Sequence, residues 1–411
     1  HGGETVPTNV TSALPEVNVT WVKQEPQLGT GHAVMQAMPL LPDDGMVVVL
    51  SGDVPLIAAD TLQALAQACG GQRLALLTVV PPDPTGYGRV VRDADGQVRA
   101  IVEQKDANDA QKAIGEVYSG IMAAPAPLLR GWLQRLDNRN AQAEYYLTDV
   151  VAKAVADGVP VVAIRAADLA QVAGVNSPAQ LAELERIYQR RQADRLMEQG
   201  VRLLDPARFD LRGELVCGRD VQIDVNCIFS GHVELADGVS VGAHCVLSDC
   251  RIEAGAQILP FTHIEGEGAG VRVGAGARIG PYARLRPGSE LGPEVHIGNF
   301  VEIKNSSMGA GSKANHLAYV GDTQMGSGVN YGAGSITANY DGANKHRTVI
   351  EADVHVGSNC VLVAPVTIGA GGTVGGGSTI TKSTEAGALS VARGKQISIA
   401  NYKRPEKKPK A

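Results

Sequence analysis

The sequence is poor in aromatic residues. Phe, Trp and Tyr make up 4% of its 411 residues, whereas glycine occurs 49 times. This imbalance is typical of tight turns, or of a repeat whose interior has no room for rings.

Several classes of protein are excluded by what is missing. No apolar run approaches the roughly 20 residues that a membrane-spanning helix needs, so we expect no membrane insertion. The formal net charge is −6, which leaves no global basic field to recruit nucleic acid. With 44% hydrophobic residues, the chain is also not intrinsically disordered.

The six cysteines form no C-x-x-C pair. A disulfide framework or a zinc site is therefore not expected, and a reducing compartment fits better. No signal peptide is visible, so we expect a cytoplasmic protein. The cysteines are Cys69, Cys217, Cys227, Cys245, Cys250 and Cys360.

The first 178 residues alternate strand-like and helix-like segments. Apolar runs at 47–50, 74–80 and 161–164 predict buried strands, and a helical pattern covers 59–69. Continuous apolar strands separated by helices predict an α/β domain with a parallel sheet.

A long helix is expected next, between two domains. Ser177 can cap it, Pro178 suits its first turn, and Gln180 completes a capping box. Gly200 closes the run. We therefore expect domains at 1–178 and 200–411, joined by a linker helix at 179–199.

From about residue 214, apolar residues recur at every sixth position, and many are followed by glycine. A strict period of six fits neither a helix nor an ordinary strand. It predicts a hexapeptide β-helix, in which each repeat supplies one short strand and one turn. One series comprises Val273, Ile279, Leu285, Leu291, Ile297 and Ile303; another comprises Ile350, Val356, Leu362, Ile368, Val374 and Ile380; a weaker one comprises Ile223, Phe229, Leu235 and Val241.

Seven segments together resemble one enzyme family. They are residues 24–33 (QEPQLGTGHA), 52–56 (GDVPL), 84–89 (PTGYGR), 144–149 (EYYLTD), 284–288 (RLRPG), 298–302 (GNFVE) and 339–342 (NYDG). In this combination the chain is similar to the bacterial bifunctional N-acetylglucosamine-1-phosphate uridyltransferases/glucosamine-1-phosphate acetyltransferases, over essentially its whole length.

The resemblance implies a Rossmann-like α/β nucleotidyltransferase domain followed by a left-handed parallel β-helix, assembled as a homotrimer. It implies acetyl transfer from acetyl-CoA to glucosamine-1-phosphate, then uridylyl transfer from UTP with release of pyrophosphate. The product, UDP-N-acetylglucosamine, feeds peptidoglycan and lipopolysaccharide synthesis.

One family feature is missing from the sequence. The family opens with a strand and a loop of the type L-x-x-G-x-G-T-x-M, which cradles the UTP phosphates. This sequence starts at His1, past that point. We therefore expect a truncated sequence and, for the chain as it stands, poor or absent uridyltransferase activity.

For the uridyltransferase, Asp53 is expected at the carboxyl end of a buried strand, where open α/β sheets bind ligands. Nucleotidyl transfer uses Mg²⁺, which prefers oxygen ligands, and the resemblance assigns it to Asp53 and Asn176. Tyr118 and Ser51 stand where the family more often has Asn and Tyr. The nucleotide and sugar positions implied are Gln24, Gly29, Thr30, Ser51, Gly52, Asp53, Gly88, Glu103, Tyr118 and Asn176.

For acetyl transfer, the substrate amine must lose a proton before it attacks a thioester, and histidine suits that task. His316 matches the catalytic base of the family. Arg286 and Lys304 match its phosphate-binding pair; they are eighteen residues apart, so three hexapeptides should stack them on one face. Tyr319 and Asn330 match the sugar contacts, and the acetyl-CoA positions implied are Ala333, Asn339, Tyr340, Ser358, Gly376 and Arg393.

Three other interpretations compete. A zinc-dependent β-helix enzyme needs converging histidines, and their spacing shows no H-x-x-x-x-H. A scaffold β-helix does not need Arg286, Lys304 and His316 together. A different sugar-nucleotide pyrophosphorylase with a regulatory β-helix is the nearest alternative. The basic tail at 401–411 is interpreted as a solvated end of the chain, with an anion-binding role as the alternative.

Overall fold

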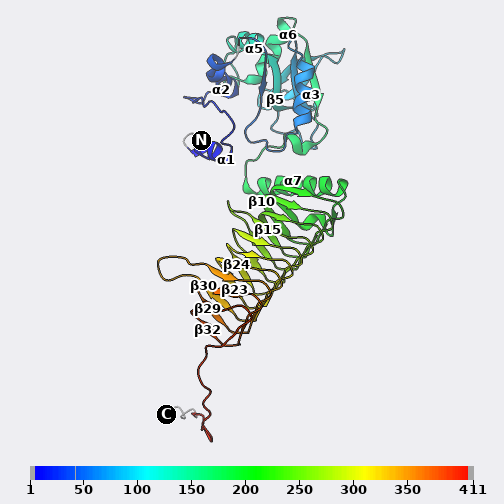
Figure 1. The fold of residues 1–411 in the computed structure, drawn as a ribbon. Helices are drawn as coiled ribbons and strands as arrows, with labels where there is room; N and C mark the ends of the chain where they lie inside the picture. Colours follow the sequence, from blue (N-terminus) through cyan, green and yellow to red (C-terminus); the bar gives the residue numbers. More distant parts are fainter. Residues whose placement is uncertain (1–4, 42, 406–411) are drawn as a thin grey trace, which may run out of the picture. The chain divides into compact units, whose positions relative to one another are not determined.

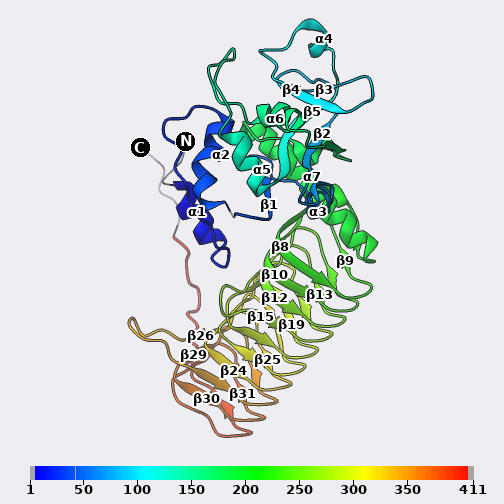
Figure 2. The same ribbon diagram turned by 90° about the horizontal axis from the view of Figure 1, so that it is seen from above.

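The computed structural model describes residues 5–41 and 43–405. The chain divides into two compact units, His1–Ile187 and Tyr188–Ala411 (Figures 1 and 2). Across the described residues, no helix has the length and apolar character needed to cross a membrane.

The first unit is a six-stranded sheet with helices packed on it (Figure 1). Its strand order is β4-β3-β5-β2-β6, and β1 also pairs with β5. The strands are β1 Met46–Val49, β2 Leu74–Val79, β3 Arg89–Arg92, β4 Val98–Val102, β5 Val117–Pro125 and β6 Val161–Arg165. The α-helices are α1 Thr5–Ala13, α2 Thr30–Ala37, α3 Ala59–Cys69, α4 Asp109–Lys112, α5 Ala126–Leu133 and α6 Val150–Ala156, with short 3₁₀ helices at Met38–Leu40, Leu147–Asp149 and Leu169–Val172.

The three predicted strands and the predicted helix are confirmed as β1, β2, β6 and α3. The prediction of a parallel sheet is wrong for most of it. Only β2 and β6 run parallel, while β5 is antiparallel to β1, β2 and β3. The apolar runs identify strands that pack well, but they carry no information on direction. β1 is also half-exposed rather than buried, with Met46 and Val48 each 37% exposed.

The long helix α7 spans Pro178–Glu198, as the capping signals predict. Ser177 Oγ accepts a hydrogen bond from the Gln180 amide. The Gln180 side chain accepts from the Asn176 amide rather than from that of Ser177, so only half of the predicted capping box forms. Towards its end, buried Gln189 makes two hydrogen bonds with the main chain of Leu211, one as donor and one as acceptor. Ala193 and Leu196 pack against the first coil of the second unit. This half of α7 therefore covers the open end of the β-helix core.

The second unit is the left-handed parallel β-helix (Figure 2). All of its strand pairs are parallel and each coil stacks on the previous one. Its strands are β7 Arg202–Leu203, β8 Phe209–Cys217, β9 Gln222–Ile223, β10 Cys227–Leu235, β11 Ser240–Val241, β12 Val246–Ile252, β13 Gln257–Ile258, β14 His263–Glu265, β15 Val271–Val273, β16 Arg278–Ile279, β17 Arg284–Leu285, β18 Ser289–Leu291, β19 His296–Asn299, β20 Glu302–Lys304, β21 Ser307–Met308, β22 Lys313–His316, β23 Tyr319–Gly321, β24 Thr323–Met325, β25 Asn330–Tyr331, β26 Ile336–Ala338, β27 Thr348–Ile350, β28 His355–Val356, β29 Val361–Val363, β30 Val366–Ile368, β31 Thr373–Val374, β32 Thr379–Ile380 and β33 Leu389–Ser390. A short 3₁₀ helix lies at Pro206–Arg208.

The hexapeptide prediction is confirmed, because every residue of the three apolar series is buried. Coils pair eighteen residues apart where the series is unbroken, as Leu285 with Ile303 shows. They pair seventeen apart from Ile303 to Val320. One repeat per coil is five residues long there, so the strict period stops at Ile303. Between β26 and β27 a loop leaves the prism, visible in both views.

The expectation that the interior excludes rings is wrong in part. Phe209, Phe229 and Tyr331 are buried in the β-helix core. Other rings lie outside, at a corner of the prism. His244, Phe261, Tyr282 and Phe300 stack in sequence with centroids 4.8 to 5.4 Å apart, and all four have positive φ. Left-handed corners therefore display rings rather than bury them.

Candidate functional sites

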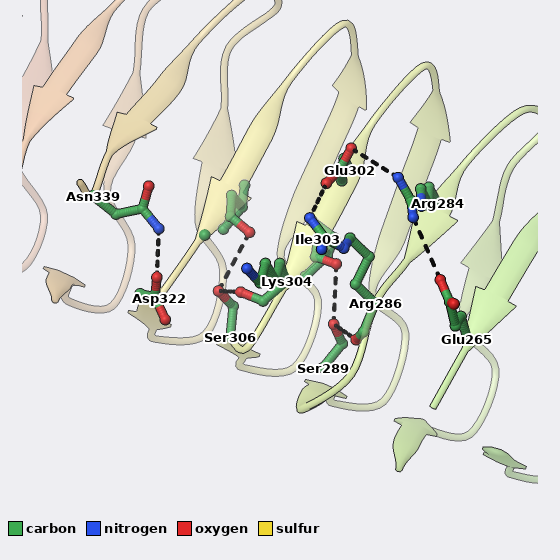
Figure 3. A network of polar contacts seen from close by, with 12 residues as sticks. Glu265, Arg284, Arg286, Ser289, Glu302, Ile303, Lys304, Ser306, Asp322 and Asn339 are labelled. Carbon is green, nitrogen blue, oxygen red and sulfur yellow. Dashed lines mark hydrogen bonds and ion pairs between the residues drawn. The ribbon is translucent and has the colours of Figure 1, made fainter. Parts of the chain in front are cut away.

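Arg286 and Lys304 lie on successive coils, as the spacing predicts. β17 pairs with β20 so that Arg284 is opposite Glu302 and Leu285 is opposite Ile303. The two cationic side chains that follow therefore occupy the same face of the prism (Figure 3). Two like charges one coil apart form a local positive field suited to a phosphate.

Two carboxylates, Glu302 and Glu265, pair with the arginines of this face. Arg286 donates to Glu302 at 3.0 Å, and Arg284 lies 3.4 Å from Glu265. The Nε of Arg286 is buried without a hydrogen-bond partner. An unsatisfied buried donor beside an exposed edge leaves one hydrogen bond to be made with an incoming anion.

The ammonium of Lys304 lies in a crowded cationic environment. The close Lys345 ammonium, burial and the Arg286 charge lower the pKa of Lys304, and the Asp322 carboxylate opposes them. Lys345 comes from the loop between β26 and β27, so this loop brings a third cation to the pair. Sequence reasoning missed Lys345, because its distance along the chain follows no repeat.

His316 ends β22 and is exposed at the corner before β23. Its Nδ1 lies 3.0 Å from the Oδ1 of Asn299, which is its partner in the parallel register. An amide oxygen only accepts hydrogen bonds, so this contact places the proton on Nδ1 and leaves Nε2 as an acceptor. The sequence did not single out Asn299 as the residue that orients the imidazole.

Tyr319 lies opposite Glu302, one coil after it. A Cβ built on Gly321 would lie 2.3 Å from the Tyr319 hydroxyl, so the ring lies over this glycine. Asn330 is exposed on β25 and pairs with Lys313 on the preceding coil. Gly321 is a site-shaping residue that sequence reasoning did not select.

The residues implied for acetyl-CoA follow on later coils. Asn339 is 9% exposed and Tyr340 is 62% exposed, both at the entry of the loop. The Ala333 carbonyl accepts from the Asn359 amide at 2.7 Å, and Arg393 donates to the Gly376 carbonyl at 2.7 Å. A Cβ on Gly376 would lie 3.4 Å from the Ser358 carbonyl oxygen, an ordinary contact.

These residues form one extended row. From Arg286 to the segment before Arg393 the register advances six coils. At about 4.8 Å per coil this is about 29 Å of edge. Such a row suits a long, narrow cosubstrate next to a small phosphorylated one.

The first unit holds a separate cavity of about 490 Å³ at the edge of its sheet. It brings together most of the residues predicted for the uridyltransferase, from segments far apart in the sequence. They are Thr30, Ser51, Asp53, Gly88, Glu103 and Tyr118. Gln24, Gly29, Gly52 and Asn176 do not line it, although Gln24 donates to the Gly29 carbonyl at 2.9 Å.

Glu103 is a partly buried acid that lines this cavity. Burial raises its pKa, against a hydrogen bond of 2.9 Å from the Thr148 hydroxyl. A Cβ on Gly88 would lie 2.7 Å from Ile101 Cγ2 and 3.4 Å from a Glu103 carboxylate oxygen, so Gly88 lies directly beside this acid. The Tyr118 hydroxyl is buried without a partner, and burial also raises its pKa. Both residues line the cavity.

Asp53 and Asn176 approach one another at Gly174. A Cβ on Gly174 would lie 2.9 Å from the Asp53 carboxylate and 4.0 Å from the Asn176 amide nitrogen. The Asp53 carbonyl also accepts from the Val175 amide at 2.9 Å. No cluster of three or more His, Cys, Asp or Glu side chains able to hold a metal occurs among the described residues. A metal here would take few protein ligands.

Two further features hold none of the predicted residues. A groove of about 630 Å³ lies on another face of the β-helix and is lined by Glu253, Arg272, Glu290 and corner glycines. In the tail, Lys403 and Arg404 are exposed. Glu406, Lys407, Lys408 and Lys410 lie outside the described residues.

Known proteins match both units. Residues 6–169 match the family described as Nucleotidyl transferase, and residues 270–305 and 347–382 match the family described as Bacterial transferase hexapeptide (six repeats). The latter two ranges contain the two unbroken apolar series.

Relatives also match over nearly the whole length of the chain. The chain is 70% identical to "Bifunctional protein GlmU" of Paracidovorax citrulli, covering 100% of this chain and 89% of the relative. It is 70% identical to the protein of that name from Acidovorax ebreus, covering 96% and 84%, and 58% identical to that of Azoarcus sp., covering 99% and 88%. The chain therefore belongs to the family of bifunctional GlmU proteins, transferases that make UDP-N-acetylglucosamine by acetyl transfer from acetyl-CoA to glucosamine-1-phosphate and uridylyl transfer from UTP.

Proposed function

We propose that acetyl transfer takes place on the edge of the β-helix where Arg286, Lys304 and His316 meet. Arg286 and Lys304 bind the sugar phosphate, and His316 is the general base. The observation that carries this proposal is the stacking of the two cations one coil apart, with the His316 imidazole on the next coil.

In this mechanism the Nδ1–H of His316 donates to Asn299, which holds the ring and leaves Nε2 free. Nε2 accepts a proton from the substrate amine. The amine nitrogen bonds to the thioester carbonyl carbon, the carbon–sulfur bond breaks, and CoA leaves as a thiolate that takes up a proton. Tyr319 and Asn330 orient the sugar. The row from Ala333 to Arg393, including Asn339, Tyr340, Ser358 and Gly376, binds acetyl-CoA.

The test measures release of free thiol from acetyl-CoA with two acceptors, glucosamine-1-phosphate and glucosamine. We expect the wild type to prefer the phosphorylated sugar strongly. Arg286→Lys keeps the charge and loses the bidentate geometry, whereas Arg286→Ala loses both. A progressive loss of preference across the two variants supports the assignment; an unchanged preference in Arg286→Ala contradicts it.

For uridylyl transfer we propose the cavity of the first unit together with the segments beside it that carry Gln24, Gly29, Gly52 and Asn176. Gln24, Gly29 and Thr30 contact the uracil, and Gly88, Glu103 and Tyr118 contact the sugar. Ser51 and Gly52 contribute to the same site. Asp53 and Asn176 hold Mg²⁺, since a carboxylate and an amide are hard oxygen donors. When bound, Mg²⁺ neutralises phosphate charge at the reacting phosphorus.

Binding of the metal can be tested without turnover. Both tryptophans of the chain, Trp21 and Trp132, lie in the first unit. Thermal unfolding followed by tryptophan fluorescence therefore reports on this unit. We expect Mg²⁺ with UTP to raise its midpoint in the wild type and not in Asp53→Asn. An equal rise in both would remove Asp53 from the metal site.

We infer a homotrimer with a site shared between neighbouring subunits. The support is the exposed ring stack at the corner beside the catalytic edge, where Phe261, Tyr282 and Phe300 are 46%, 48% and 57% exposed. Contiguous exposed rings of this kind mark surfaces that a partner covers. Sedimentation of the wild type and Phe300→Ser checks this: dissociation with loss of acetyl transfer supports it, and an active monomer contradicts it.

We further propose the functional division 1–178, 179–199 and 200–411 for the uridyltransferase, linker helix and acetyltransferase. A cytoplasmic location fits an enzyme that consumes acetyl-CoA and UTP. It also fits six cysteines that are all unpaired.

A further inference from the structure

Asp322 is a buried carboxylate next to the acetyltransferase site. It is 7% exposed and occupies a left-handed corner, φ 48°, between β23 and β24. Two side-chain amides converge on it. Asn305 Nδ2 donates to one carboxylate oxygen at 2.5 Å. Asn339 Nδ2 donates to the other, a contact drawn in Figure 3.

The two hydrogen bonds require a carboxylate at position 322. Both neighbours present amide hydrogens, so the central group must accept on both sides, which a carboxylate does and an amide does not. Burying a charge is costly unless it is hydrogen-bonded and balanced by other charges. The two amides satisfy the first condition, and the cations near Lys304 satisfy the second.

Asp322 also contacts both ends of the loop between β26 and β27, which together form the loop neck. Its carboxylate binds the side chain of Asn339 where the chain leaves the prism, and its carbonyl accepts from the Thr348 amide at 3.2 Å where the chain returns. Above these contacts, the Asn339 carbonyl accepts from the His346 amide at 2.8 Å, and Tyr340 pairs with Lys345. One residue of the preceding coil therefore fixes the base of the whole loop.

The loop carries two groups that the site uses. Tyr340 lies beside Asn339 in the proposed acetyl-CoA row, and Lys345 approaches Lys304. Without a fixed neck, the loop would have to be ordered by the cosubstrate on binding, at a cost in affinity. The position of Asp322 thus couples the shape of the acetyl-CoA row to the charge of the phosphate pair.

We propose that Asp322 is a positioning residue for acetyl-CoA: its carboxylate fixes the Asn339 amide and the loop neck. This inference rests on the proposed acetyl-CoA row. It predicts different effects on the two substrates. Loss of the Asn339 contact weakens the binding of acetyl-CoA. Loss of a negative charge near Lys304 leaves the binding of the sugar phosphate unchanged or makes it tighter.

The experiment compares Asp322→Asn with the wild type in the thiol-release assay. We expect the KM for acetyl-CoA to rise about tenfold, as for one lost hydrogen bond to a charged group. The KM for glucosamine-1-phosphate should stay constant or fall. A purely structural defect would raise both KM values together and lower the unfolding temperature of the β-helix, and that result would overturn the proposal.

Asp249→Asn is the matched control. Asp249 also occupies a left-handed position, φ 46°, on the same corner, and the register places it four coils before Asp322. Its carboxylate accepts from the His232 amide, far from the loop. We expect both KM values to stay at the wild-type level. If Asp322→Asn behaves like Asp249→Asn, Asp322 positions nothing.

Limited trypsin digestion gives a readout independent of turnover. Lys345 and Arg347 are cleavage sites at the loop neck. We expect faster cleavage there in Asp322→Asn, with unchanged cleavage elsewhere in the β-helix; equal rates would overturn the proposal. If wild-type protein releases no thiol, the proposed acetyl-CoA row fails, and digestion still decides whether Asp322 holds the loop.

A second variant covers the case that Asp322→Asn does not fold. Asn305→Gly removes one donor, and glycine tolerates the left-handed φ of 44° at this corner. The Asp322 carboxylate then keeps only the side-chain hydrogen bond from Asn339. We expect the same split between the two KM values, with a smaller rise for acetyl-CoA; no change in either KM would count against the proposal.

Discussion

The two units assemble their sites in different ways. In the β-helix, residues reach one edge through the register of successive coils, so Arg286, Lys304 and Tyr319 come together because their spacing matches the repeat. In the first unit, Thr30, Asp53 and Glu103 meet from unrelated segments around a mixed sheet. A repeat makes site geometry a property of sequence spacing; a mixed sheet makes it a property of topology.

The largest effect is expected where the repeat presents a single reactive group. His316→Ala should lower acetyl transfer by about 10²- to 10⁴-fold, the usual contribution of a general base. Its side chain is exposed, so the coil should keep its fold. Thiol release and circular dichroism check the two statements. His263→Ala, on an exposed position of β14, is the control and should remain active; an active His316→Ala would remove the proposed base.

A smaller effect is expected where a glycine makes room for a side chain of its own strand. In Gly321→Ala the new Cβ would lie 2.3 Å from the Tyr319 hydroxyl, so the ring must move. We expect the KM for glucosamine-1-phosphate to rise by about tenfold, as for one displaced polar contact. Initial rates at varied sugar phosphate measure this, and a KM equal to that of the wild type would mean that Tyr319 does not contact the sugar.

In the first unit, function and stability should conflict at Glu103. Burial raises its pKa in the folded state, so the native protein binds a proton more readily than the unfolded chain, and stability falls as the pH rises through this range. Glu103→Gln removes the charge and keeps the acceptor for Thr148.

We therefore expect Glu103→Gln to raise the unfolding midpoint of this unit at pH 8, with the gain shrinking as the pH falls towards 4.5. Tryptophan fluorescence measures it, because both tryptophans lie in this unit. Glu16→Gln, at an exposed carboxylate of the same unit, is the control. A gain that does not depend on pH would show that the Glu103 charge is not its cause.

The smallest effect is expected at Gly376, which replaces an alanine common in the family that the chain resembles. An added Cβ would be 3.4 Å from the Ser358 carbonyl, an ordinary van der Waals distance. We expect Gly376→Ala to change the KM for acetyl-CoA by less than about twofold. It is also the matched control for Gly321→Ala, and a large change would place Gly376 in direct contact with the cosubstrate.

The same contrast explains how much the sequence could predict. Strict periodicity predicted the interior of the β-helix and the stacking of Arg286 on Lys304. Apolar runs predicted β1, β2 and β6. The long strand β5 was missed because Ser119 and Gly120 interrupt its apolar pattern, and with it the antiparallel order of the sheet.

Residues that act by positioning another residue could not be predicted from the sequence. Asp322 has the sequence signature of an ordinary turn aspartate, and only the fold brings Asn305 and Asn339 to it. Asn299 and Gly321 are similar, since Asn299 acts through His316 on the next coil and Gly321 acts through Tyr319 on its own strand. The roles assigned to the site residues themselves stay predictions until the variants are measured.

The coils before Arg286 have a consequence for how such a chain can change in length. None of the proposed acetyltransferase residues lies between β7 and β16, and each coil there contacts only its neighbours. Gain or loss of one whole coil would lengthen or shorten the prism by about 4.8 Å and leave the contacts of the catalytic edge within one subunit in place. A single inserted residue in a strand would instead turn the following side chains from the interior to the surface. The length of this part of the enzyme can therefore change only in steps of one coil.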